Sequence, residues 1–529
     1  MTETATAQTR ADAAYQKRWW ILLVLCFSLL VITLDNTILN VALPTIVRDL
    51  HASNSQLQWM VDSYTLIFAS LLLTAGTLGD RFGRRGALMV GLAIFGIGSL
   101  LCSQASGPSM VIAMRALMGI GGAFIMPATL SILTNVFPPK ERGAAIGIWA
   151  GVAGIGIALG PLAGGVLLEH FYWGSIFLVN VPVVAIAVPL VLMIIPTSKD
   201  PAAPELDIAG SALTIVGLTA LLYGLIEAPT KGWTNATILG AFAVGVVFLA
   251  AFALWERHTD HPMLDVRFFQ NRRFTAASLS VTFVFFALFG TTFLTTQYFQ
   301  FVLGYNPLQT GYRLLPFALV MMVIAPTSAR IVKVVGTKVV VATGLGLVTL
   351  GLVLLSQLAV TSSYFDIIWR MMLLAGGMAL TMAPATDSIM GALPLSKAGV
   401  GSAVNDTTRM VGGALGVAVI GSIMSSIYGH QMADFASKNN LPGELANTVE
   451  SQIGAALQVA QGLPGALGES VTNAAKEAFV SGMHTAVFVG AAVAALGVLV
   501  AAIWLPARPR PEDVADQVAE AELGAEYPN

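Results

Sequence analysis

Long apolar stretches recur along this 529-residue chain, and each is close to the length that a helix needs to cross a lipid bilayer. About 20 mostly apolar residues span the roughly 30 Å of hydrocarbon. A transmembrane β-barrel would show alternating segments of about ten residues instead. The sequence therefore predicts an all-α polytopic membrane protein with 14 transmembrane helices. These helices are expected near residues 19–43, 57–79, 86–106, 109–135, 143–168, 173–195, 208–228, 236–256, 274–302, 311–332, 338–360, 365–393, 401–428 and 477–505.

Composition excludes a water-soluble protein of this size. The chain is 56% hydrophobic and 11% charged, whereas soluble proteins have about 25% charged residues. The formal net charge of −2 gives no electrostatic reason to expect nucleic acid as a partner. Cys26 and Cys102 both lie in apolar stretches, so we interpret them as small hydrophobic side chains rather than as a disulfide.

The distribution of basic residues predicts the orientation in the membrane. With the N-terminus in the cytoplasm, most of the 27 Lys and Arg residues fall in cytoplasmic segments, as in other membrane proteins. An even number of crossings returns the C-terminus to the same side. The Ala- and Gly-rich composition, with more Arg than Lys, indicates a GC-rich bacterium. We therefore expect a multi-pass protein of the bacterial inner (plasma) membrane with both termini in the cytoplasm.

An internal repeat divides the chain. Arg115 is followed by Pro-Ala-Thr at 127–129, and Arg370 by the same tripeptide at 384–386, 257 residues further on. Parallel repeats of this kind occur in transporters whose two halves rock around a central site. The expected organisation is a cytoplasmic N-terminal tail at 1–18, an N-terminal six-helix bundle at 19–200, two extra transmembrane helices and a cytoplasmic connector at 201–273, a C-terminal six-helix bundle at 274–505 with an external insertion at 430–475, and a cytoplasmic tail at 506–529.

Four short motifs follow one another in the first half of the chain. They are LDNTILNVALP at 34–44, GTLGDRFGRR at 76–85, Arg115 with Gly119, and G-x-x-x-G-P-x-x-G-G at 156–165. Together they resemble the motifs of the major facilitator superfamily, and within it the fourteen-span drug:proton antiporters of bacterial multidrug efflux. The resemblance implies the major facilitator fold, alternating access driven by a proton gradient without a cofactor, and a functional monomer. One departure is Trp-Gly-Ser at 173–175, where the family commonly has Trp-Arg-Trp.

Charged residues inside the predicted spans are the candidates for proton coupling. A charge at the bilayer centre costs about 2.5–3.5 kcal/mol on insertion scales, so its presence requires a reason. Asp35 is flanked by apolar residues on both sides, and Asp62 lies nearer the start of its span. A carboxyl in an apolar cavity can exchange a proton near neutral pH. We predict that Asp35 carries the proton and senses the substrate, and that Asp62 and Asp406 are further titrating groups.

Charged residues in the other spans have structural as well as functional interpretations. By resemblance Arg115 is the proton-relay arginine, and a purely structural contact to a carboxylate or backbone carbonyl is the alternative. Arg409 follows Asp406 by three residues on one helix face, so the two are expected to form a local ion pair, which is either structural or functional. Glu227 and Asp387 are close to span ends, from which long polar side chains can reach the headgroups.

Two glycine-containing motifs have mechanical interpretations. The resemblance implies a conformational latch, in which Asp80 pairs with basic residues and with a helix terminus of the opposite half. The latch residues are Gly76, Asp80, Arg81, Gly83, Arg84 and Arg85. The glycines of the antiporter motif are expected to form a smooth helix face against which another helix packs closely, and the resemblance implies that this face seals the two halves against leakage. Its residues are Gly156, Gly160, Pro161, Gly164 and Gly165.

No catalytic motif is present in the sequence, so we predict that the protein is not an enzyme. It contains no P-loop lysine motif, no H-E-x-x-H and no G-x-S-x-G. His258, Asp260 and His261 lie on a polar connector, and we expect no metal there. The predicted function is a proton-coupled antiporter that exports amphipathic, often cationic or aromatic, small molecules. The alternatives are a dedicated exporter of one metabolite, antibiotic or lipid, a solute–proton symporter and, least favoured, an intramembrane enzyme.

Overall fold

The computed structural model describes residues 15–50, 52, 54–200, 206–259 and 261–508, without the side chains of a few residues such as Pro161 and Pro307. Most of the two predicted tails, at 1–18 and 506–529, therefore lies outside the described residues. Within them the chain is helical and contains no strand. The helices begin and end at α2 Arg18–Leu50, α3 Asn54–Phe82, α4 Arg84–Ser103, α5 Pro108–Val136, α6 Pro139–His170, α7 Ser175–Leu178, α8 Asn180–Ile194, α9 Ile208–Lys231, α10 Ala236–Trp255, η1 Val266–Gln270, α11 Arg272–Gln297, η2 Tyr298–Val302, α12 Pro307–Arg313, α13 Leu315–Val335, α14 Thr337–Leu355, α15 Tyr364–Met390, η3 Leu395–Lys397, α16 Ala398–Lys438, α17 Gly443–Ser451, α18 Ile453–Gly462 and α19 Gly465–Trp504.

Thirteen helical segments of the described chain are long and apolar enough to cross a membrane. A further long helix, α6, has 32 residues and packs between α2 and α13 inside the same bundle. A membrane offers no water to the backbone, so the peptide groups of each crossing segment must bond within their own helix. The all-helical membrane fold predicted from the sequence is confirmed.

Two of the predicted spans are interrupted rather than continuous. The span expected at 173–195 consists of α7 and α8, which meet at Val179, and the one expected at 311–332 consists of α12 and α13, which meet at Leu314. Pro182 and Pro316 lie within the first turn of the second helix in each case. Proline has no N–H to extend the hydrogen bonds of the preceding helix, and this breaks the ladder there.

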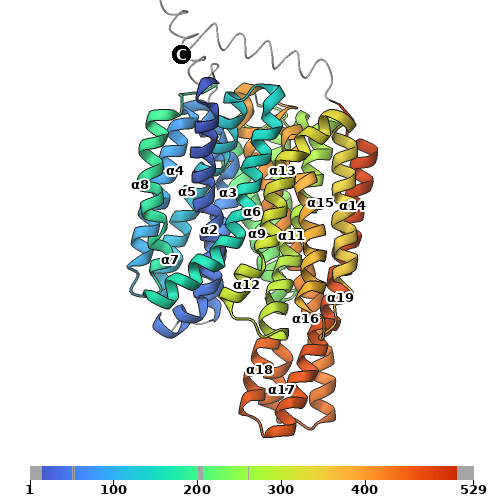
Figure 1. The fold of residues 1–529 in the computed structure, drawn as a ribbon. Coiled ribbons are helices and arrows are strands. Elements are labelled where there is room, and N and C mark those ends of the chain that lie inside the picture. Colours follow the sequence, from blue (N-terminus) through green and yellow to red (C-terminus); the bar gives the residue numbers. More distant parts are fainter. Residues whose placement is uncertain (1–14, 51, 53, 201–205, 260, 509–529) are drawn as a thin grey trace, which may run out of the picture.

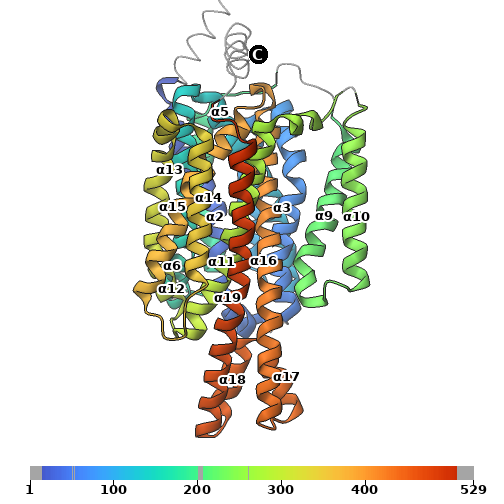
Figure 2. The same ribbon diagram turned by 90° about the vertical axis from the view of Figure 1, so that its right-hand side faces the viewer.

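The long helices form a parallel-sided bundle (Figures 1 and 2). We refer to α2–α8 as the N-terminal bundle and to α11–α16 with α19 as the C-terminal bundle. Contacts between them run through α6 with α13 and through α3 and α5 with α16. Helices α9 and α10 form a hairpin at the side of the bundle, next to α3 (Figure 2). There α9 contacts both α3 and α16, and the Thr219 hydroxyl donates to the Ser70 hydroxyl at 2.8 Å.

The predicted external insertion at 430–475 consists largely of extensions of the two long helices that flank it. Helix α16 continues to Lys438 and α19 begins at Gly465, well outside the expected spans, and α17 and α18 connect them. The chain turns after α16 at Asn440, which has a positive φ of 50°, a conformation that asparagine tolerates better than most residues. The four helical segments project from one end of the bundle (Figure 1). At the opposite end lies the predicted cytoplasmic connector, between α10 and α11, and η1 is its helical segment among the described residues.

Glycines allow the closest helix contacts. A Cβ built at Gly416 of α16 would lie 2.2 Å from the backbone oxygen of Phe286 in α11, so only hydrogen fits there. A Cβ at Gly346 of α14 would meet no atom within 4 Å. Close backbone approach at small residues is how helices associate in lipid, where the hydrophobic effect does not drive them together.

We expect Gly416→Ala to destabilise the protein by about 1–3 kcal/mol, because overpacking forces α11 and α16 apart. Gly346→Ala is the matched control and should leave stability unchanged or slightly increased, since alanine favours helix. Thermal unfolding of the full chain in lipid nanodiscs measures both. Equal unfolding midpoints for the two variants would contradict this account of the α11–α16 contact.

Candidate functional site

A buried ion pair lies in the middle of the N-terminal bundle. The Asp35 side chain of α2 has no exposed surface, and its Oδ2 accepts a hydrogen bond from Nη1 of Arg115 in α5. The Asn180 amide of α8 donates to the other carboxylate oxygen at 3.1 Å and to the Ser99 hydroxyl at 3.2 Å. Both carboxylate oxygens are therefore held by side chains from other helices. This is the arrangement that makes a charge tolerable away from water.

Arg115 has contacts that do not depend on Asp35. Its Nε donates to the backbone oxygen of Met60 at 3.0 Å, and its guanidinium lies 4.3 Å from the centre of the Tyr64 ring. A cation over an aromatic face is stabilised electrostatically. If the carboxylate becomes protonated, the guanidinium still has a carbonyl and a ring on α3 to hold it in place.

The antiporter motif packs directly against the helix that carries Asp35. A Cβ at Gly156 or Gly160 of α6 would lie 2.0 and 1.8 Å from the hydroxyl oxygens of Thr33 and Thr37. The Thr37 hydroxyl also contacts the backbone oxygen of Gly156 at 3.2 Å. The two threonines flank Asp35 at a distance of two residues on either side. The glycines thus let α6 support the segment of α2 that holds the buried carboxylate.

The contact between the two bundles involves earlier glycines of the same helix. A Cβ at Gly147 would lie 2.6 Å from the backbone of α13, and one at Gly151 would lie 3.2 Å from Met322 of α13. Within the predicted motif, Gly165 faces Leu308 of α12. Gly164 is buried, and the Pro161 side chain lies outside the described part of the structure. The contact between the two bundles therefore begins about two helical turns before the antiporter motif, the segment that was expected to form it.

The turn at 76–85 contacts the first turn of α16. Asp80 is buried, and its two carboxylate oxygens accept from the backbone N–H groups of Gly399 and Val400 at 2.9 and 3.1 Å. These are the second and third residues of α16, whose N–H groups have no partner within the helix. Arg84 donates to Asp80 at 2.8 Å and to the backbone oxygen of Leu395 at 2.8 Å. A carboxylate of the N-terminal bundle thus caps a helix of the C-terminal bundle.

The other predicted latch residues make contacts of their own. Gly76 lies so close to α16 that a Cβ would meet the Gly399 backbone oxygen at 2.6 Å. Gly83 has a φ of 113°, which a residue with a side chain rarely adopts. Arg85 donates to the backbone oxygen of Ile195 at 3.3 Å, and Arg81 lies over the Phe82 ring at 5.4 Å.

Asp406 and Arg409 form a pair in α16, with 3.6 Å between Oδ1 and Nη1. Both side chains are buried, and the second Asp406 oxygen has no hydrogen-bond partner in the described structure. Arg409 also donates to the Thr386 hydroxyl at 3.2 Å and lies 5.0 Å from the ring of Trp149 in α6. The pair is therefore placed where the C-terminal bundle meets the N-terminal bundle, and it is looser than the Asp35–Arg115 pair.

Asp62 does not belong to either pair. It is half-buried on α3, with Gln58 one turn earlier as its hydrogen-bond partner and Glu227 of α9 as a neighbouring charge. Glu227 is itself buried and pairs with the exposed Lys231 at 3.2 Å. The structure thus places Asp62 and Glu227 near each other, although nothing in the sequence indicated that they are neighbours.

Three functional candidates were missed from the sequence. Asn180, Arg142 and Arg273 carry no motif of their own. Asn180 binds Asp35, whereas Arg142 of α6 and Arg273 of α11 interact electrostatically with Asp387 of α15. The partners are separated by more than one hundred residues in each case. The only signal available was the rule that a charge buried in a membrane needs an opposite charge or a polar partner.

The described residues include no group of three or more His, Cys, Asp and Glu side chains able to hold a metal ion. Asp260, one of the polar residues considered in the connector, lies outside them.

The bundle of membrane-length helices, with interhelical ion pairs buried inside it, defines a polytopic membrane protein. The model of the Major Facilitator Superfamily matches residues 25–417, and the chain belongs to this family. It is 34% identical over 519 residues to the tetracenomycin C resistance and export protein of Streptomyces glaucescens, covering 96% of this chain and 95% of that protein. It is also 34% identical over 487 residues to the multidrug efflux pump LfrA of Mycolicibacterium smegmatis, covering 92% and 95%.

Solved structures agree with the fold. A bacterial homologue of the human lysosomal transporter Spinster, in an inward-facing conformation, aligns with a TM-score of 0.58 at 19% identity, covering 93% of this chain and 99% of that chain. The predicted family is confirmed, and its members are transporters rather than enzymes.

The Asp35–Arg115 pair generates a prediction for stability. Asp35→Asn and Arg115→Gln should each destabilise the protein by about 3–5 kcal/mol, because each leaves an uncompensated charge in the membrane interior. The double variant should be more stable than either single variant, since no charge remains. A double-mutant cycle of thermal unfolding in nanodiscs measures the coupling. Additive effects would mean that the two charges do not stabilise each other.

Proposed function

We propose that the protein is a proton-coupled antiporter that exports amphipathic, often cationic or aromatic, small molecules. One observation carries this proposal: a carboxylate without exposed surface is paired with an arginine of another helix and supported by the glycines of the antiporter motif. The names of the relatives, an antibiotic export protein and a multidrug efflux pump, support the same cargo class.

Exchange follows from competition for Asp35. In the conformation described, this carboxylate is closed off from water, whereas the adjacent Asn36 is exposed. Proton exchange thus requires a rearrangement that opens α2 to one side of the membrane. A proton on Asp35 weakens its pairing with Arg115, and a cationic substrate nearby favours the ionised form. Proton and substrate therefore displace each other as access alternates.

The energetics favour more than one titrating group. One proton exchanged for one monovalent cation moves no net charge, so a one-unit pH gradient supplies only about 1.4 kcal/mol, or about tenfold accumulation. A second proton adds the same amount again and lets the membrane potential contribute about 2.3 kcal/mol per 100 mV. Asp406, with one carboxylate oxygen unpartnered in the described structure, is the better second carrier, and Asp62 is the third candidate.

The Asp80 cap would hold one end of the transporter closed during this cycle. Two backbone donors and one guanidinium neutralise the carboxylate, so the contact stabilises only the conformation in which the two bundles meet there. With the N- and C-termini assigned to the cytoplasm of a bacterial cell, this closed end is cytoplasmic and the stabilised state is outward-open. The protein would work as a monomer in the inner membrane, without a cofactor.

One alternative function uses the same scaffold. A dedicated exporter of one metabolite, antibiotic or lipid would share the coupling residues and differ only in cargo. The relative from Streptomyces glaucescens, named for one antibiotic, is the observation that favours it. A growth-inhibition panel that compares a deletion strain with an overexpressing strain separates the two: protection against a single compound identifies a dedicated exporter.

Asp35→Asn should remove the contribution of one coupled proton to export. In everted vesicles with a one-unit pH gradient, the variant should lose about tenfold accumulation of a fluorescent cation such as ethidium, since one coupled proton is removed. Glu169→Gln, at an exposed acid near the end of α6, is the control and should transport normally. Full-rate export and substrate-triggered proton release by Asp35→Asn would refute the assignment.

Asp80→Asn tests the latch separately from binding. Replacing the charged hydrogen bonds removes about 1.5–3 kcal/mol from the closed conformation, so turnover should fall about tenfold or more. Equilibrium binding of ethidium to the purified variant should stay within about twofold of wild type, because Asp80 caps α16 and holds no cargo. Weak binding with normal turnover is the pattern that contradicts the latch.

A further inference from the structure

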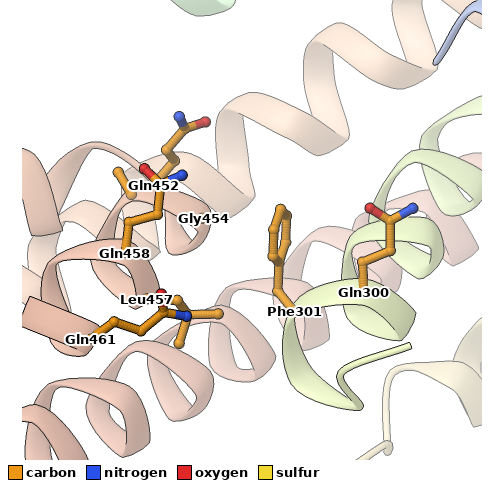
Figure 3. Close-up of a pocket in the computed structure, with 8 residues that line it drawn as sticks. Gln300, Phe301, Gln452, Gly454, Leu457, Gln458 and Gln461 are labelled. Carbon is orange, nitrogen blue, oxygen red and sulfur yellow. The ribbon is translucent and has the colours of Figure 1, made fainter. Parts of the chain in front are cut away.

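A cavity of about 480 Å³ lies outside the proposed transport pathway, between η2 at the end of α11 and α18 of the external insertion. Figure 3 shows its lining, with Gln300 and Phe301 on one side and the side chains of α18 on the other. Pockets of roughly 300–1,000 Å³ are typical for small ligands. The proton-coupling residues contribute nothing to it.

The lining is amide-rich and uncharged. Four glutamines, Gln300, Gln452, Gln458 and Gln461, line the cavity together with Phe301 and Leu457. Gln300 is half-buried and the other three are exposed. In the described part of the chain, no hydrogen bond of these four amide groups to another side chain or to the backbone is found. Each amide offers two donors and an acceptor, so the cavity presents both kinds of hydrogen-bonding group without a formal charge.

Two backbone features adjoin the cavity, a π-helix on one side and a closely packed glycine on the other. The five residues of η2 form a π-helix rather than an α-helix, and such segments are rare and frequently occur at functional sites. On the opposite wall, a Cβ at Gly454 would lie 3.2 Å from the ring of Phe301. The glycine therefore lets the ring edge approach α18. Phe301 is half-buried, so part of the ring remains open to the cavity.

We propose that this cavity binds an uncharged polyhydroxylated ring, that is, a sugar. Hydroxyl groups need both a donor and an acceptor, which carboxamides provide side by side, and the Phe301 ring supplies an apolar surface for the C–H face of a sugar ring. A charged ligand would lose its hydration without gaining an opposite charge from the lining. The site therefore selects neutral polar rings over ions.

The location of the cavity allows two sources for such a ring. Gln300 lies near the end of the candidate membrane span Arg272–Val302, so the cavity is at the level of the membrane surface. A glycolipid headgroup can reach it from the bilayer, and a free or glycosylated small molecule can reach it from the surrounding water. The recognition chemistry is the same for both, and the experiment distinguishes them.

The test uses the full chain in phosphatidylcholine nanodiscs, prepared without sugar-based detergents. Saturation-transfer NMR with maltose probes the free sugar, and co-purification of monoglucosyl diacylglycerol added to the lipid, measured by mass spectrometry, probes the headgroup. We expect a signal in at least one arm. The double variant Gln458→Ala/Gln461→Ala should weaken it by about fivefold or more, as loss of one or two hydrogen bonds implies. The variant Phe301→Leu should weaken it to a similar extent, because it removes the aromatic surface for the sugar ring. Ala455→Trp, which fills the cavity while keeping the amides, should abolish it.

Gln357→Ala is the matched control, since Gln357 is an exposed glutamine between α14 and α15 and away from the cavity. Equal thermal unfolding midpoints show that the variants are folded. Maltose binding alone identifies a soluble ligand, and glycolipid retention alone identifies a headgroup. Absence of both signals, or signals unchanged in Ala455→Trp, overturns the proposal. Binding is measured without a proton gradient, so the outcome is independent of the proposed antiport.

Discussion

The fold of this transporter depends on how it places charge where water cannot reach. Asp35 and Arg115 neutralise each other between α2 and α5, and Asn180 of α8 completes the hydrogen bonding of the carboxylate. An unpaired charge at this depth would be expensive, so three helices are fixed to one another around the pair. The same dependence makes the pair sensitive to protonation, because a proton on Asp35 removes its negative charge and weakens the attraction that holds the helices together.

The carboxylate of Asp80 is also buried, but different groups neutralise its charge. Its carboxylate is paired with Arg84 and with the free N–H groups at the start of α16, where the helix dipole favours negative charge. The first pair joins helices of one bundle, whereas this cap joins the two bundles. A transporter that alternates between conformations needs both: a stable interior within each bundle and a contact between bundles that can be made and broken.

Much of this could be predicted from the sequence. The apolar stretches indicated the membrane helices, and the motifs indicated the family and marked Asp35, Asp80 and Arg115. The breaks at Val179 and Leu314 were missed, although Pro182 and Pro316 were visible, because proline inside a membrane helix does not always interrupt it. The length of α16 beyond residue 428 was also missed, since a helix outside the bilayer needs no continuous hydrophobicity.

The sequence by itself determined that the chain is an all-helical membrane protein and to which family it belongs, because both depend on local composition, periodicity or short motifs. Only the tertiary structure decided which charges meet. Asn180 reaches Asp35, Arg142 and Arg273 act on Asp387, and Glu227 approaches Asp62, and none of these pairs has a local signal. The physical reason is that a helix bonds its own backbone within a few residues, whereas a buried charge can find its partner on any neighbouring helix.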